Sequence, residues 1–95
     1  MIRAGIVGGA GYTGGELLRL LIRHPEADVV YTHSRSNQGK MVTNVHSDLL
    51  GECDLIFGPD RIPEVDVLFL CLGHGESKAF LEKQILPEQV RIIDL

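Results

Sequence analysis

The stretch Gly8-Gly9-Ala10-Gly11-Tyr12-Thr13-Gly14 decides how this chain folds, because it joins two runs of different character. Residues 4–7 form a short apolar run before it, and residues 16–23 form a leucine-rich run with interspersed charges after it. The first run is typical of a buried strand and the second of an amphipathic helix. A strand that turns into a helix within so few residues needs backbone conformations that glycine reaches without steric cost. We therefore expect a strand, a tight glycine loop and a helix.

The spacing of these glycines adds a functional prediction. Gly9, Gly11 and Gly14 follow the G-x-G-x-x-G pattern of dinucleotide-binding loops, and Gly8 completes the related G-x-x-G-x-x-G pattern. Because glycines lack side chains, an anion can approach the N–H groups at the start of the helix, where the helix dipole favours negative charge. The stretch predicts a pyrophosphate cradle. The alternative is a glycine-rich turn that binds no ligand.

Composition excludes two classes of partner. The 95 residues allow one domain, residues 1–95, and 44% hydrophobic with 23% charged residues is ordinary for a globular protein. A net charge of −4 argues against nucleic acid and anionic membrane surfaces, since either needs a basic patch. No apolar run approaches membrane-spanning length, and the N-terminus begins directly with strand residues, so we expect no signal peptide. Cys53 and Cys71 lie in strand-like runs, which indicates buried thiols and a cytoplasmic protein.

The first helix carries a signal at each end. Thr13 and Glu16 fit the S/T-x-x-E capping box, while direct contact of Thr13 with a phosphate is an equal alternative. Pro25 disfavours helical geometry in the residue before it, so we expect the helix to stop at His24, with that side chain in solvent.

The residues after the second expected strand, 27–33, indicate which cofactor binds. Sites specific for NAD carry an acidic residue about 20 positions beyond the glycines, where it binds the ribose 2′-hydroxyl. Here that position holds Ser34, followed by Arg35 and Ser36, and no carboxylate. A serine hydroxyl and a guanidinium complement a 2′-phosphate, which a carboxylate would repel. This predicts NADP; the alternative is an ordinary polar turn with a solvated arginine.

The remaining chain alternates strand-like and helix-like runs. Residues 37–51 read as a loop with room for a short helical turn, in which His46 faces solvent or a neighbouring domain. The further elements that we expect are a short strand at 52–57, a buried parallel strand at 65–72, a helix at 76–84 and a last strand at 90–95.

This alternation predicts an α/β fold, a Rossmann-like doubly wound parallel sheet, truncated at about five strands. The first strand and strand 65–72 should be neighbours at the switch point, so that Gly73-His74-Gly75 forms the second lip of the crevice. His74 is then either a donor that faces the cofactor or a turn residue. The residues assigned to cofactor binding are Gly8, Gly9, Gly11, Tyr12, Thr13, Gly14, Ser34, Arg35, Ser36, Leu72, Gly73, His74 and Gly75; none is assigned to catalysis or to a metal.

Several motifs together resemble the N-terminal part of the N-acetyl-gamma-glutamyl-phosphate reductase family, which is related to aspartate-semialdehyde dehydrogenase. They run through the whole chain: G-I-V-G-G-A-G-Y-T-G-G-E-L-L-R-L-L at 5–21, H-P-E at 24–26, S-R-S at 34–36, V-H-S-D-L-L-G at 45–51, D-V-L-F-L-C-L-G-H-G-E-S at 66–77 and R-I-I-D-L at 91–95. Ser47 and Gly73 stand where the family commonly has proline.

The resemblance implies an NADP-dependent reduction of N-acetyl-gamma-glutamyl phosphate to its semialdehyde, in arginine biosynthesis, by a homo-oligomer. A cysteine thiolate would attack the acyl phosphate, and hydride would pass between the thioester and nicotinamide. The family's cysteine and histidine lie in later segments, and Cys53 and Cys71 do not match them. The chain is therefore expected to be a cofactor-binding fragment that has no reductase activity alone.

Other readings stay open. The closest is a different acyl-phosphate reductase such as aspartate-semialdehyde dehydrogenase. An extended short-chain dehydrogenase or epimerase would place an acidic residue after the second strand and a Tyr-x-x-x-Lys motif downstream, but Tyr12 and Tyr31 are followed at that spacing by Glu16 and Arg35. A protein that senses NADP without chemistry is the non-enzymatic alternative.

Overall fold

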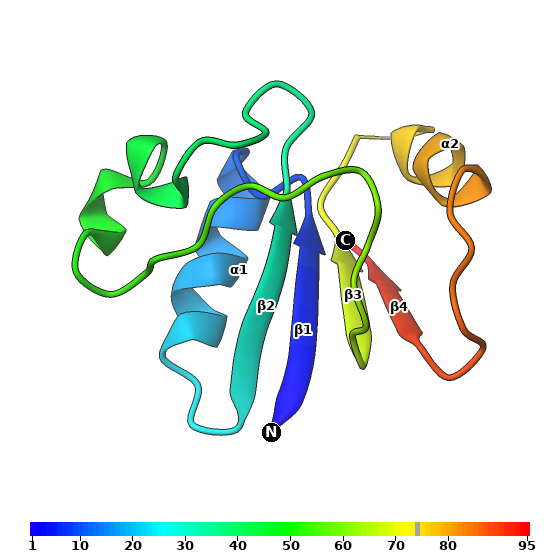
Figure 1. The fold of residues 1–95 in the computed structure, drawn as a ribbon, viewed down its shortest axis with the longest axis horizontal. Helices are drawn as coiled ribbons and strands as arrows, with labels where there is room; N and C mark the ends of the chain where they lie inside the picture. The colour runs from blue at the N-terminus through cyan, green and yellow to red at the C-terminus, as the bar shows by residue number, and fades with distance from the viewer. Residues whose placement is uncertain (74) are drawn as a thin grey trace.

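The glycine loop joins a strand to a helix, as expected, in a computed structural model that describes residues 1–73 and 75–95. Figure 1 shows the elements as one twisted sheet with helices beside it. In chain order they are β1 (Ile2–Val7), α1 (Tyr12–Ile22), β2 (Ala27–His33), the 3₁₀ turns η1 (Val42–Asn44) and η2 (Ser47–Leu49), β3 (Val67–Leu70), α2 (Glu76–Glu82) and β4 (Arg91–Asp94).

The sheet is parallel, with the strand order β2-β1-β3-β4. In the centre, Ile6 of β1 stands in register with Thr32 of β2 on one side and Phe69 of β3 on the other. The chain continues from β1 to β2 on one side of it and later places β3 on the other side. The strand order therefore reverses direction at β1, and this topological switch point lies at the carboxyl end of β1. This confirms the α/β class and the expected neighbourhood of the first strand and the 65–72 strand.

The sheet has four strands rather than about five, and the strand expected at 52–57 is wrong. That segment pairs locally with residues 39–42 and does not join the sheet: Gly39 N–H donates to Phe57 O, Phe57 N–H to Lys40 O, and Val42 N–H to Leu55 O. Its apolar residues Cys53 and Phe57 are buried all the same. Apolar alternation predicted burial correctly, but it could not say which partner the backbone takes.

The capping box at the start of α1 is also wrong. The helix begins at Tyr12, its N-cap is Gly11, and no side chain caps it. Thr13 therefore lies inside the first turn, and Glu16 makes an ion pair with Arg19 at 3.2 Å. At the other end α1 stops at Ile22, close to the stop expected from the proline at position 25.

The two faces of the sheet bury separate apolar clusters. On the α1 side they are Ile6, Leu18, Val42, Leu49, Cys53 and Phe57; on the opposite side they are Val7, Val65, Leu68 and Leu70. The segment between residue 58 and β3 crosses in front of the sheet in Figure 1 and supplies Val65 to the second cluster. Both faces of β1 are thus covered, as a central parallel strand requires.

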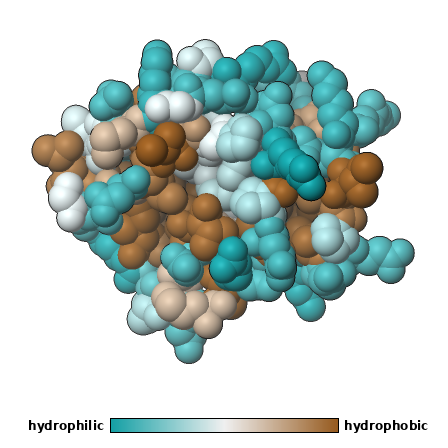
Figure 2. Space-filling view, in the orientation of Figure 1, coloured by the Kyte–Doolittle hydropathy of each residue, from teal (hydrophilic) through white to brown (hydrophobic). Residues whose placement is uncertain are grey.

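The part of the chain that follows β3 is less enclosed. All four residues of β4 are exposed, and Ile85 is fully exposed. Apolar side chains accordingly reach the surface over the region of α2 and its connection to β4 (Figure 2). No helix among the described residues is long and apolar enough to cross a membrane.

Candidate functional site

The glycine loop is anchored to the end of β2. The N–H groups of Gly8 and Gly9 both donate to the His33 carbonyl at 2.9 Å, and Gly11 N–H donates to Gly8 O at 3.3 Å. Gly8 has φ +86°, and a Cβ there would lie 2.5 Å from Cys71 O. Glycine is therefore required at position 8 both for its backbone conformation and for the close approach of the chain that leaves β3.

Gly9 and Gly14 are required by packing alone. A Cβ on Gly9 would collide with the hydroxyl of Thr32, a fully buried group with no hydrogen-bond partner among the described residues. A Cβ on Gly14 would collide with Gly8 O and lie 2.8 Å from Gly9 Cα. The first turn of α1 therefore sits directly on the loop, as the last glycine of a dinucleotide fingerprint allows.

Gly11 differs, because a Cβ there would meet nothing closer than Gly8 O at 3.7 Å. Beside it, the N–H groups of Ala10, Tyr12, Thr13 and Gly14 donate to no carbonyl of the described chain. Tyr12 and Thr13 are exposed. Unpaired donors at a helix N-terminus, next to space that only a missing side chain leaves open, suit an anion such as a pyrophosphate.

The turn after β2 brings together the three residues expected to recognise a 2′-phosphate. Ser34 is buried, and its hydroxyl accepts a 2.8 Å hydrogen bond from the Asn37 amide, which closes the turn. Arg35 and Ser36 are exposed. The glycine loop and β2 meet at His33 O, which accepts hydrogen bonds from Gly8 and Gly9. Arg35 follows this point by two residues.

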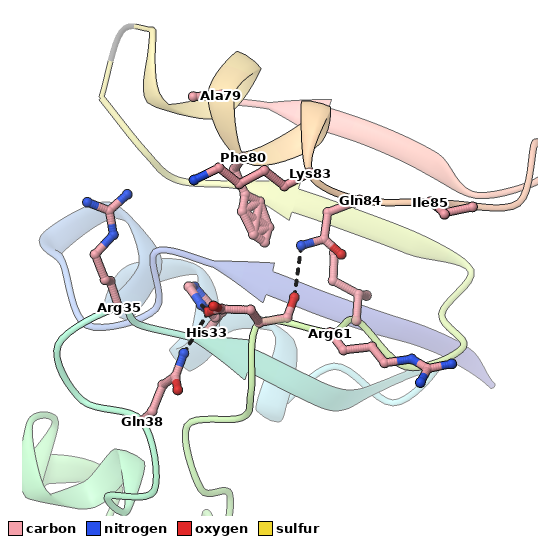
Figure 3. Close-up of a pocket in the computed structure, with 11 residues that line it drawn as sticks. His33, Arg35, Gln38, Arg61, Ala79, Phe80, Lys83, Gln84 and Ile85 are labelled. Carbon is pink, nitrogen blue, oxygen red and sulfur yellow. Dashed lines mark hydrogen bonds and ion pairs between the residues drawn. The ribbon is translucent and has the colours of Figure 1, made fainter.

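Arg35 lines a cavity of about 920 Å³ between β2, the crossing segment and α2 (Figure 3). The other charged side chains that line this cavity are the cations Arg61 and Lys83 and the anion Asp60. The rest of the lining is His33, Gln38, Ile62, Ala79, Phe80, Gln84 and Ile85. The cavity thus has more cationic than anionic side chains, which suits a phosphorylated ligand.

Asp60 holds the wall of this cavity in place. Its carboxylate accepts hydrogen bonds from His33 Nε2 at 2.8 Å and Gln38 Nε2 at 2.6 Å, and its carbonyl accepts one from Gln84 Nε2 at 2.8 Å (Figure 3). The bond from His33 lowers the pKa of Asp60 below its ordinary value. The His33 ring also lies against Phe80, with ring centroids 5.2 Å apart. Both side-chain hydrogen bonds reach the same oxygen, Oδ1, while the Asp60 side chain as a whole stays exposed.

The chain after β3 runs beside the glycine loop. Cys71 N–H donates to Val7 O at 2.8 Å, and Leu72 would lie 3.1 Å from a Cβ on Gly8. Gly73 is exposed, and Gly75, with φ +82°, is the N-cap of α2. His74 lies outside the described residues. The chain that leads into the expected second lip therefore lies beside Gly8 at the switch point, through Cys71 and Leu72.

The expectation that His46 faces solvent or a neighbouring domain is wrong. Its side chain is buried, and its Nε2 lies 2.7 Å from Gly9 O. The helix accommodates the ring at Gly15, where a Cβ would lie 2.5 Å from His46 Cε1. Sequence reasoning missed both residues. The signal that could have found them is the pair Gly14-Gly15, because two consecutive glycines in a helix need a packing reason.

Neither cysteine is presented as a nucleophile. Cys53 is buried, and burial raises the pKa of the half-buried Cys71 thiol, with Asp94 adding to the effect. A raised thiol pKa disfavours the thiolate that attacks substrates.

A strand, a glycine loop and a helix at the switch point of a parallel sheet define a dinucleotide-binding domain of the Rossmann type. Residues 3–95 match the family described as semialdehyde dehydrogenase, NAD binding domain, and the chain belongs to that family.

Within the family, the chain is similar over its whole length to the NAD(P)-binding part of N-acetyl-gamma-glutamyl-phosphate reductases. It is 56% identical over 97 residues to the enzyme of Bacteroides fragilis and 54% identical over 97 residues to that of Phocaeicola vulgatus. Each alignment covers 100% of this chain and 30% of the relative, so the chain spans about 30% of the length of the curated relatives it matches. The resemblance expected from the motifs is confirmed.

A solved structure shares the fold. The crystal structure of aspartate semialdehyde dehydrogenase with NADP from Candida albicans superimposes with a TM-score of 0.71 at 20% identity. The match covers 86% of this chain and 26% of that one. It supports the fold of the four-stranded parallel sheet and its helices.

Proposed function

We propose that this chain binds NADP(H), with the pyrophosphate at the loop 8–14 and the 2′-phosphate at Arg35. Residues 72, 73 and 75 would form the second lip, with His74 as a further contact. The observation that carries the proposal is the space at Gly11 beside unpaired N–H groups, adjoining a strand end that delivers a guanidinium. Backbone donors suit the pyrophosphate that NAD and NADP share, and the guanidinium suits the phosphate that only NADP carries.

Asp60 is the one anion among the described residues that line the cavity, and it would oppose a 2′-phosphate. Its hydrogen bonds from His33 and Gln38 both go to Oδ1 and hold the carboxylate beside these two residues. Arg35 has no ion-pair partner among the described residues, and in Figure 3 its guanidinium points away from Gln38. The guanidinium is therefore free to pair with a phosphate, which favours NADP over NAD.

For the whole protein we propose the activity that the relatives are named for, the NADP-dependent reduction of N-acetyl-gamma-glutamyl phosphate in arginine biosynthesis, in a cytoplasmic homo-oligomer. The cofactor supplies hydride when it is bound. The described residues contribute binding and orientation: the loop 8–14 holds the pyrophosphate, and Arg35 selects the ribose end. No residue of this chain is assigned to catalysis.

The assignment of binding but not catalysis to residues 1–95 can be tested separately. Residues 1–95 should show no oxidation of NADPH that depends on the acyl phosphate, because neither thiol is exposed or favoured as a thiolate. Turnover by residues 1–95 that is lost in Cys53→Ser or Cys71→Ser would place the nucleophile here and overturn the assignment.

Binding of NADP is tested by calorimetric titration of the protein with NADP, NAD and adenosine 2′-monophosphate. We expect NADP to bind more tightly than NAD, by about tenfold or more, since a guanidinium–phosphate contact contributes about 1.5–3 kcal/mol. The 2′-monophosphate should bind weakly and compete with NADP. Equal affinity for NAD and NADP would contradict the assignment of Arg35, and no binding of either would contradict the site.

A further inference from the structure

The buried imidazole of His46 lies against the back of the glycine loop. The residue joins η1 to η2, is 7% exposed, and places its Nε2 2.7 Å from Gly9 O. A carbonyl oxygen only accepts hydrogen bonds, so Nε2 carries the proton and donates. No other described residue donates to Gly9 O.

The ring is held from several directions. His46 N–H donates to Val42 O at 2.9 Å, and Leu49 N–H donates to His46 O at 3.0 Å, while Val42 and Leu49 are fully buried. On the helix side, Gly15 leaves only the space that the ring fills. The imidazole therefore has little freedom to turn away from the loop.

Ion pairs fasten the same segment to α1. The Arg19 guanidinium donates to both oxygens of Asp48, at 2.7 and 2.9 Å, and Arg23 donates to both oxygens of Glu52, at 3.1 Å each. These bidentate contacts join η2 and the residues after it to the helix whose first turn follows the loop. The loop, α1 and the η1–η2 segment thus form one connected unit.

The hydrogen bond to Gly9 O has a consequence on the ligand side of the loop. The peptide between Gly9 and Ala10 is planar and trans, so its N–H points opposite to its C=O. When His46 holds the Gly9 carbonyl on one side, the Ala10 N–H is aimed to the other. That N–H is among the donors left unpaired beside Gly11.

We propose that His46 is a positioning residue, which orients the Gly9–Ala10 peptide so that the loop presents a preformed donor to the cofactor pyrophosphate. The proposal rests on the proposed NADP site and adds a residue that does not touch the ligand. It predicts that loss of the imidazole lowers the affinity for every ligand that carries the pyrophosphate, because part of the binding free energy is then spent on ordering the loop.

The test compares three variants by titration with NADP and with adenosine 2′-monophosphate. His46→Leu removes the donor, His46→Gln keeps an N–H at similar reach, and His24→Leu is the matched control. His24 is an exposed histidine beyond the far end of α1, and its Nδ1 accepts a bond from Glu26 N–H. We expect His46→Leu to weaken NADP about tenfold and the monophosphate less than twofold, and His46→Gln to recover most of the loss.

Amide exchange measured without ligand provides an independent readout. His46→Leu should accelerate exchange at Gly9 and Gly11, whose N–H groups donate to His33 O and Gly8 O, and leave β3 unchanged. His46→Gln should restore slow exchange. If His46→Leu does not fold, Gly15→Ala displaces the ring while keeping the donor and should produce the same pattern. Wild-type affinity in folded His46→Leu with unchanged exchange at Gly9 and Gly11, or equal losses for both ligands, would overturn the positioning role and leave the NADP site standing. Failure of the wild type to bind NADP would instead contradict the proposed function, and exchange would still decide the role of His46.

Discussion

The glycine loop and the turn after β2 meet at the His33 carbonyl, yet they are built in opposite ways. In the loop, atoms within a few ångströms require glycine at Gly8, Gly9 and Gly14, and in the proposed site the unpaired backbone N–H groups would contact the ligand. In the turn at residues 34–36, the backbone only positions side chains, and Arg35 extends from it into a cavity.

This difference separates affinity from selectivity. Under the proposed function, backbone donors would bind the pyrophosphate, which NAD and NADP share, whereas the Arg35 guanidinium would bind the 2′-phosphate that only NADP carries. Substitutions in the loop should therefore lower the affinity for both cofactors and, where packing is tight, also the stability of the fold. Changes in the turn should affect one cofactor and leave the fold intact.

The largest effect is expected from Gly14→Ala. The added Cβ collides with Gly8 O and comes within 2.8 Å of Gly9 Cα, both backbone atoms that cannot move aside cheaply. Overpacking of this kind outweighs the gain in helix propensity, so we expect a loss of about 2–3 kcal/mol in the free energy of unfolding, measured by urea denaturation. Unchanged stability would show that the loop and α1 are less closely packed than the structure indicates.

Gly11→Ala separates packing from ligand approach. Its Cβ meets only Gly8 O at 3.7 Å, so the fold should lose no more than about 1 kcal/mol, the cost of a poorer N-cap residue. Affinity for NADP and NAD should fall together, by about tenfold or more, because the methyl group occupies the space beside the free donors. A loss confined to one cofactor in the titration would contradict the division between loop and turn.

Arg35→Ala tests the turn. NADP should bind about tenfold more weakly and NAD within about twofold of wild type, since the lost contact involves only the 2′-phosphate. The control is Arg61→Ala. This variant removes a guanidinium that lines the same cavity but points away from Arg35 in Figure 3. An equal loss of NADP affinity in both variants would mean that the cavity attracts phosphate by its overall charge.

The smallest effect concerns the ion pair behind the loop. The hydrogen bond from Arg19 lowers the pKa of Asp48 to about 2 from an ordinary value of 3.8. A lowered native pKa stabilises the fold above the ordinary value, and this contribution is lost as the pH falls toward the native one. Asp48→Asn should therefore lower the Tm slightly at pH 7, with the difference from wild type vanishing between about pH 4 and pH 2.

The control for this pH series is Asp54→Asn, which alters an exposed carboxylate outside the ion pairs of the described residues. A difference between wild type and Asp48→Asn that persists at pH 2 would show that Asp48 stabilises the segment through something other than its charge.

Sequence reasoning was strongest where local rules and tertiary contacts agree. The second strand, 27–33, was predicted with its observed bounds, since β-branched residues there also face the core. The glycine pattern predicted the loop, and the alternation of strands and helices predicted that β1 and β3 are neighbours, through the switch-point rule. The position of Ser34 and Arg35 after the second strand was predicted from their distance in sequence to the glycine loop alone.

The residues that sequence reasoning missed depend on contacts far apart in the chain. His46 sits in a segment without periodicity, and only the folded chain shows that its imidazole reaches Gly9, 37 positions away. The segment 52–57 has strand-like composition but pairs with residues 39–42, outside the four-stranded sheet. Neither propensity nor spacing carries that information.

The most direct test of the central claim is a pair of ¹H–¹⁵N titrations of the protein, one with NADP and one with NAD. We predict that both ligands shift the amides of residues 8–14 and 72–73, and that only NADP also shifts those of residues 34–36. Shifts confined to another place, such as the cavity of about 560 Å³ that includes Ile2, His24 and Ile93, would contradict the site. Equal shifts of residues 34–36 with NAD and NADP would contradict the claim that the loop provides affinity and the turn provides selectivity.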